Sequence, residues 1–122
     1  MEKQLAHITD ATLEIKERGI LNFWIYVDYE EGSSQDVGGL ALDEYDPETK
    51  ERVGTAYGCE MIRQLLLTLD VNDLKDAAGK MIWVIGEGAG FDFKPKGIKQ
   101  LRKDGGRELV FADVYNRFME GY

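Results

Sequence analysis

The segment 20–29 constrains the fold most, because its side chains alternate regularly between two faces. Leu21, Phe23, Ile25 and Val27 share one face, and Asn22, Trp24, Tyr26 and Asp28 share the other. Alternation with a period of two is typical of a strand that buries one face. Residues 5–16 alternate more loosely, and a turn at 17–19 connects the two segments. The sequence therefore predicts an antiparallel hairpin.

The rest of the chain supplies one strong helix and several weaker segments. Ile62, Leu65, Leu66 and Leu69 recur at helical spacing, which predicts a helix over 56–69 with one buried stripe. We expect further strands at 37–43, 80–85, 98–102 and 107–111, a short helical turn from Asn72 through Ala77, and a last helix at 112–119. Gly38-Gly39 predicts a bulge or a close backbone contact.

These elements predict a single α+β domain over residues 1–122. Its architecture is expected to be an antiparallel sheet packed against one main helix, with a short C-terminal hairpin and helix. The length of 122 residues is typical of one domain.

The charge of the chain is unevenly distributed. Residues 1–93 carry 8 Lys/Arg against 19 Asp/Glu, whereas residues 94–122 carry 7 against 4. The net charge of −8 argues against binding to duplex nucleic acid, which depends on a basic face. A basic segment on an acidic body is instead expected to hold a small anion.

Other features bear on the compartment. The single cysteine excludes an internal disulfide and fits a reducing cytosol. The N-terminus shows no signal-peptide pattern, and the apolar runs are far shorter than the roughly 20 residues of a membrane span. We therefore expect a cytoplasmic protein without a membrane partner, in the host cell cytoplasm if a phage encodes it.

No pattern in the sequence predicts catalysis, a metal site or a cofactor. His7 has no companion ligands, and Cys59 is expected to be a buried thiol. The acidic residues 43–48 lack the glycine of a calcium loop, so a solvated turn is expected there. Gly86-Glu87-Gly88-Ala89-Gly90 is followed by Pro95 and basic residues rather than by the helix that a dinucleotide fingerprint requires.

The basic segment is the best candidate for binding. Six cationic residues, Lys94, Lys96, Lys99, Arg102, Lys103 and Arg107, follow directly after Phe91 and Phe93. A solvated basic hairpin is the simplest interpretation of such a run. The alternative is a nucleotide site, in which guanidinium groups bind phosphate and an aromatic ring carries the base.

Four ordered pieces of sequence resemble a known family. They are Gly19-Ile20-Leu21 at the hairpin, residues 32–35 with 38–43, the glycine-spaced helix entry Gly54–Ile62, and residues 71–84. Over residues 8–85 they resemble the first family of phage Thoeris anti-defence proteins. The resemblance implies a non-enzymatic sponge that binds cyclic ADP-ribose isomers made by TIR-domain proteins. It also implies assembly through dimers into larger oligomers, and capture of the cyclic oligonucleotides of CBASS defence by some members.

We therefore expect a homo-oligomeric sponge that sequesters a cyclic nucleotide immune signal. Phe91, or failing that Phe93, would stack on adenine, while Arg102, Lys103 and Arg107 would pair with the pyrophosphate. Arg52 and Arg63 are second-tier candidates from across a subunit interface, and the loop 86–90 would close over the ligand. The alternatives are a phage inhibitor that binds a host defence protein directly, as anti-CRISPR proteins do, and a cyclic nucleotide hydrolase.

Overall fold

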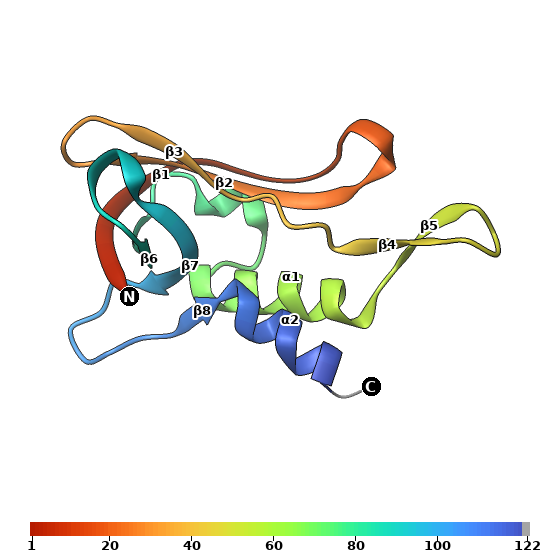
Figure 1. The fold of residues 1–122 in the computed structure, drawn as a ribbon. Helices are drawn as coiled ribbons and strands as arrows, with labels where there is room; N and C mark the ends of the chain where they lie inside the picture. The colour runs from red at the N-terminus through yellow and green to blue at the C-terminus, as the bar shows by residue number, and fades with distance from the viewer. Residues whose placement is uncertain (121–122) are drawn as a thin grey trace.

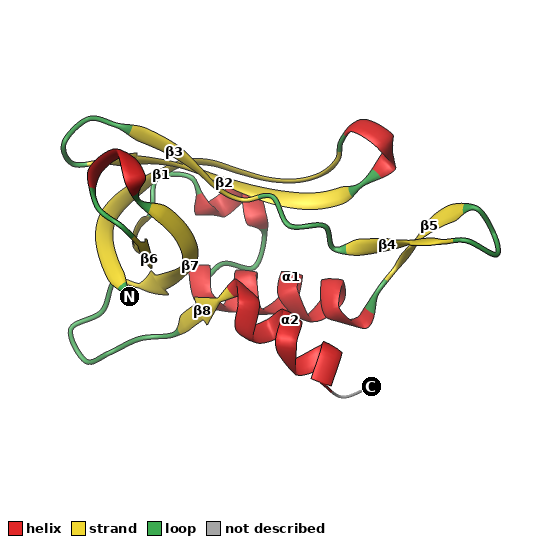
Figure 2. Cartoon of the chain, in the orientation of Figure 1, coloured by secondary structure: helices red, strands yellow, loops and turns green. Residues whose placement is uncertain are grey.

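A computed structural model describes residues 1–120 and confirms the α+β class (Figures 1 and 2). Six strands form an antiparallel sheet in the order β3-β2-β1-β6-β7-β8. Their bounds are β1 Glu2–Ile15, β2 Leu21–Tyr29, β3 Ser34–Gly38, β6 Met81–Glu87, β7 Lys94–Gln100 and β8 Glu108–Val110. Strands β4 (Asp43–Asp46) and β5 (Glu51–Gly54) form a separate ribbon. The helices are α1 (Ala56–Leu69) and α2 (Phe111–Glu120), with 3-10 turns η1 (Glu17–Gly19), η2 (Leu74–Ala77) and η3 (Gly90–Asp92).

The β1–β2 hairpin is confirmed, and a bulge adjusts its pattern. Ile8 pairs with Val27 but Asp10 pairs with Tyr26, so one extra residue lies in β1 at Thr9. The bulge changes which face the odd-numbered residues occupy. As a result Ile8 and Ala11, three positions apart, are both buried on the core side.

The sheet curls until β3, at one edge, reaches β7 (Figure 1). Gln35 on β3 connects this strand to the residue just before β7, because its Nε2 donates to the carbonyl oxygen of Phe93 at 3.1 Å. The hydroxyl of Tyr29 donates to Gln35 Oε1 at 2.5 Å. Apolar side chains of the curled sheet and of α1 and α2 fill one core.

Helix α1 has the expected bounds but buries a rotated stripe. Leu65 and Leu69 are buried as expected, whereas Ile62 and Leu66 are only half-buried. Met61 and Thr68 take the remaining core positions. The helix ends at Asp70, which adopts the left-handed conformation (φ 56°, ψ 49°) and donates its N–H to the carbonyls of Leu66 and Leu67.

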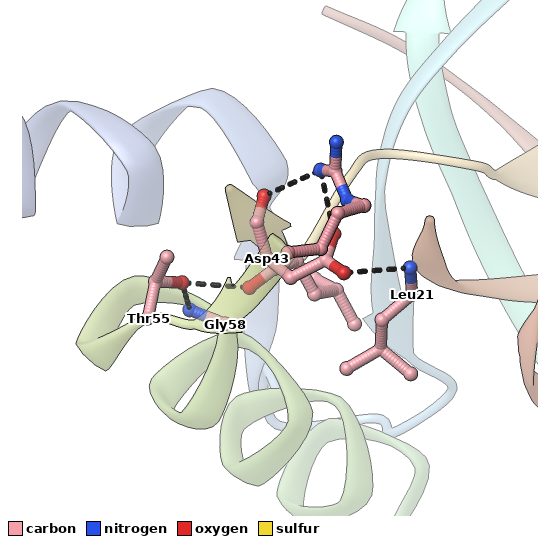
Figure 3. Close-up of polar contacts among 6 residues, drawn as sticks. Leu21, Asp43, Thr55 and Gly58 are labelled. Carbon is pink, nitrogen blue, oxygen red and sulfur yellow. Dashed lines mark hydrogen bonds and ion pairs between the residues drawn. The ribbon is translucent and has the colours of Figure 1, made fainter. Parts of the chain in front are cut away.

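The start of α1 is fixed to the chain that leaves the sheet (Figure 3). Thr55 caps the helix, accepting from Gly58 N at 2.8 Å and donating to the carbonyl of Leu42 at 2.6 Å. Asp43 accepts from Leu21 N at 3.1 Å and from Arg52 at 2.8 Å. Helix α1, ribbon β4–β5 and the start of β2 therefore meet at one polar cluster.

Several expected boundaries are wrong. The third strand covers 34–38 rather than 37–43, because the chain leaves the sheet at Gly39. Ribbon β4–β5 was not expected, since its polar residues show no alternation. Strand β7 begins at Lys94 rather than at residue 98 and ends at Gln100. The N-cap of η2 is Asp73 rather than Asn72.

The expectation of a buried thiol is also wrong, because Cys59 lies on the exposed side of α1.

The predicted close contact at Gly38-Gly39 is confirmed. A Cβ at Gly39 (φ +79°) would lie 2.4 Å from Cη2 of Trp24, and one at Gly38 (φ +115°) would lie 2.7 Å from the ring of Phe23. Both glycines let the backbone cross these rings where no other residue fits.

We expect Gly39→Ala to lower the free energy of unfolding by about 2–4 kcal/mol, because it adds overpacking to a left-handed backbone. Urea denaturation measures the effect. The matched control is Gly54→Ala, where a Cβ meets no atom within 4 Å and φ is not positive. Equal stability of the two variants would contradict the contact.

Candidate functional site

The structure separates the aromatic and cationic groups that the sequence placed together. Phe91 lies in η3 and is fully exposed, just before β7 begins. Arg102 follows the other end of β7. A strand of this length spans about 20 Å at 3.3 Å per residue. Within one chain, Phe91 therefore does not face the ligand that Arg102 would bind.

The expectation that Phe93 could stack on a base is wrong. Phe93 is only 3% exposed and packs edge-on against Tyr29, with ring centroids 6.3 Å apart, so it offers no free face. Within segment 86–90, Gly86 belongs to β6 and Gly88 packs closely, whereas a Cβ at Gly90 would meet no atom within 4 Å, and closure of this segment over a ligand stays a prediction. A Cβ at Gly86 would lie 2.2 Å from the carbonyl oxygen of Lys94, and one at Gly88 2.4 Å from that of Asp92.

The two second-tier arginines differ in how they are held. Arg52 donates to both the carboxylate and the carbonyl oxygen of Asp43, at 2.8 and 3.0 Å (Figure 3). This guanidinium is the main reason that the pKa of Asp43 lies below its usual range. Arg63 is exposed and pairs with Glu60 at 3.1 Å. Arg52 therefore has a structural role, and Arg63 lies on the outer surface of the helix.

Arg102 lines a pocket at the other end of α1, which we call the α1-end pocket. Its volume is about 240 Å³. The polar residues around it come from the end of α1 (Thr68, Asp70), from Lys80 before β6, and from the end of β7 (Gln100, Arg102). Its apolar residues include Met81 and Leu101, which are 39% and 47% exposed.

Thr68 gives this pocket an unusual polar group. The residue is 1% exposed, and its Oγ1 has no hydrogen-bond partner. A buried hydroxyl without a partner costs about 1–3 kcal/mol. Less than 1 Å² of this oxygen is exposed to solvent, so a ligand can reach it only if the pocket wall moves.

The cations of the pocket are held weakly. Nζ of Lys80 donates to the carbonyl oxygen of Asp70 at 3.3 Å, and Arg102 lies 3.6 Å from the carboxylate of the same residue. Both cations compensate the partial negative charge at the C-terminus of α1. The Arg102–Asp70 pair is largely exposed, and such pairs contribute little to stability.

The other residues of the predicted site surround this pocket without lining it. Arg107 turns along α1 and donates to Gln64 Oε1 at 2.7 Å. Its backbone N–H donates to Gln100 Oε1 at 2.9 Å, which closes the β7–β8 hairpin. Lys103 lies exposed in the loop of that hairpin.

A second pocket lies at the start of α1, with a volume of about 670 Å³. Tyr57 and Tyr115 form part of its wall, with ring centroids 5.3 Å apart at 90°, and Phe118 lies beside them. Burial, and then Tyr115, raise the pKa of Tyr57 above its ordinary value. The charged residues that line it are Asp43 and Glu44, so its chemistry does not favour phosphate.

Sequence reasoning identified Arg102 but missed Thr68, Lys80 and Gln100. Within residues 1–120, no three His, Cys, Asp or Glu side chains gather as metal ligands. Over the same residues, no helix has the length and apolar character needed to cross a membrane. In comparisons with known proteins, no family model, curated protein or solved structure matches the chain. The resemblance to Thoeris anti-defence proteins stays a prediction.

The first test of the site concerns stability. Thr68→Val removes the unpaired hydroxyl and keeps the shape of the side chain, so we expect it to raise the free energy of unfolding by about 1 kcal/mol. Urea denaturation measures this change. Loss of more than about 1 kcal/mol would show that the hydroxyl has a partner within the chain.

The second test concerns the anchor at the other end of α1. The pKa of Asp43 is lower in the folded chain than its ordinary value of 3.8, so Asp43 stabilises the fold at pH above this value. This stabilisation is lost as pH falls through the depressed pKa. We expect Asp43→Asn to be less stable than the wild type at pH 7, with a gap that narrows below about pH 4. Glu44→Gln is the control, and a gap independent of pH would contradict the assignment.

Proposed function

We propose that this protein is a non-enzymatic sponge that captures a cyclic nucleotide and so blocks a bacterial anti-phage defence. Cyclic ADP-ribose isomers and cyclic oligonucleotides are the candidate ligands. The observation that supports this proposal most is that two weakly held cations, Lys80 and Arg102, line one pocket.

The pocket suits a phosphate group attached to a larger molecule. Lys80 and Arg102 supply charge-assisted hydrogen bonds, which are about twice as strong as neutral ones. The amide of Gln100 is already bonded within the chain, because its Nε2 donates to the carbonyl oxygen of Leu67 at 3.3 Å and its Oε1 accepts from Arg107 N at 2.9 Å. The exposed side chains of Met81 and Leu101 offer apolar surface to a sugar or a base.

The size of the pocket indicates how much of the ligand it takes. Sites that enclose a whole small molecule measure about 300–1,000 Å³, and the α1-end pocket measures about 240 Å³. It therefore takes a phosphate and an adjoining sugar. The rest of the ligand would lie over Leu101 and the loop that carries Lys103, or against a second copy of the chain in a homo-oligomer.

Capture without turnover is consistent with the residues present. Neither His7 nor Cys59 lines the pocket. A sponge requires tight binding and slow release but no general base or nucleophile. Affinity differences within one binding site lie mainly in the dissociation rate. We therefore expect loss of a phosphate contact to raise the rate at which the ligand dissociates.

Direct inhibition of a host protein is the second candidate function. Ribbon β4–β5 carries acidic residues and exposes Tyr45 at 56%. Tyrosine is enriched at the anchor points of protein interfaces. A basic surface on a host defence protein would complement this ribbon.

A capture assay with cyclic ADP-ribose tests the proposal. The protein is incubated with the signal, denatured by heat, and the supernatant is analysed by chromatography. Intact signal that was withheld before heating supports a sponge. A degraded product would show an enzyme, and no withheld signal together with a host protein in a pull-down would show the second candidate.

Variants test whether the α1-end pocket holds the ligand. We expect Arg102→Glu to weaken capture by at least about tenfold, because a charge-assisted hydrogen bond contributes 1.5–3 kcal/mol. The matched control is Arg117→Glu, which makes the same charge change on the exposed surface of α2 outside the pocket. Unchanged capture by Arg102→Glu would overturn this site.

A further inference from the structure

Asp70 lies between both cations of the α1-end pocket. Its backbone carbonyl accepts from Lys80 Nζ at 3.3 Å, and its carboxylate lies 3.6 Å from Arg102. The left-handed conformation at the end of α1 directs the two groups of this one residue to different cations. A phosphate that binds Arg102 in the pocket therefore lies close to the carboxylate of Asp70.

The charges that line the pocket favour a ligand phosphate that carries a single negative charge. Among the described residues, the charged side chains that line the pocket are Lys80, Arg102 and Asp70, which leaves one net positive charge. A bridging phosphate in a diester or a capped pyrophosphate carries one negative charge. A terminal phosphate carries about 1.5–2 at pH 7. The additional charge of a terminal phosphate would lie near the Asp70 carboxylate, and the described lining of the pocket supplies no third cation to balance it.

We propose that Asp70 is a specificity-determining residue that selects phosphates bridged on both sides over terminal phosphates. This proposal rests on the proposed function and deepens it. It explains how a sponge for cyclic nucleotides avoids being filled by nucleotides that end in a terminal phosphate, such as ADP and ATP. The carboxylate repels a terminal phosphate more strongly than a bridging one, because the repulsion scales with the charge of the ligand.

Cyclic ADP-ribose and ADP are suitable probes, because both contain adenosine and a pyrophosphate but only ADP has a terminal phosphate. Their dissociation constants are measured by calorimetry at pH 7.5 for the wild type and for Asp70→Asn. Asparagine also adopts the left-handed conformation, so the helix end is preserved. We expect the variant to bind both probes more tightly, and to lose about three- to tenfold of the preference for cyclic ADP-ribose.

Asp76→Asn is the matched control, since it removes the same charge from the exposed surface of η2 outside the pocket. It should leave the ratio of the two dissociation constants unchanged. High salt should reduce the difference between wild type and Asp70→Asn, because exposed charges are screened.

The outcomes separate the two proposals. If the wild type binds cyclic ADP-ribose and Asp70→Asn keeps the same ratio of dissociation constants, the role of Asp70 is wrong and the sponge remains. If the wild type binds neither cyclic ADP-ribose nor a cyclic oligonucleotide, the proposed function is wrong and the role of Asp70 falls with it.

Discussion

The contact between the start of α1 and the backbone at Leu42 is the constraint on which the rest of the structure depends. Gly58 approaches so closely that a Cβ there would lie 2.0 Å from the carbonyl oxygen of Leu42. The cap Thr55 bonds the same carbonyl. With this end fixed beside the polar cluster of Asp43, the helix runs across the curled sheet. Its other end then reaches the beginning of β6 and the end of β7, where the pocket forms.

The sequence predicted those elements whose side chains repeat with the period of a strand or a helix. The β1–β2 hairpin and the bounds of α1 follow from alternation and helical spacing. The sequence does not predict ribbon β4–β5, because Asp43, Glu44 and Glu51 make both strands polar and leave no alternation of apolar residues. The early start of β7 was hidden by Lys94 and Pro95, which are untypical of a strand.

The candidate site was harder to predict because it is assembled from distant segments. Thr68, Lys80 and Gln100 are each separated by more than ten residues, and only the packing of α1 against the sheet brings them together. The sequence alone indicates that Thr68 is a polar helix residue, whereas burial and the missing partner are properties of the fold. The opposite error arose for Phe91 and Arg102. Their closeness in sequence suggested one site, but the intervening residues form an extended strand that separates them.

The two ends of α1 differ in how firmly their polar groups are bonded. At its start, the side chains of Thr55 and Asp43 have short hydrogen bonds, and the Asp43 carboxylate is largely buried. At its end, contacts of 3.3–3.6 Å hold Lys80 and Arg102, and the Thr68 hydroxyl has no partner. Binding sites are drawn from the less stable parts of a protein, because groups that are already fully bonded gain little from a ligand. The end of α1 is therefore where a ligand can contribute most to the stability of the folded chain.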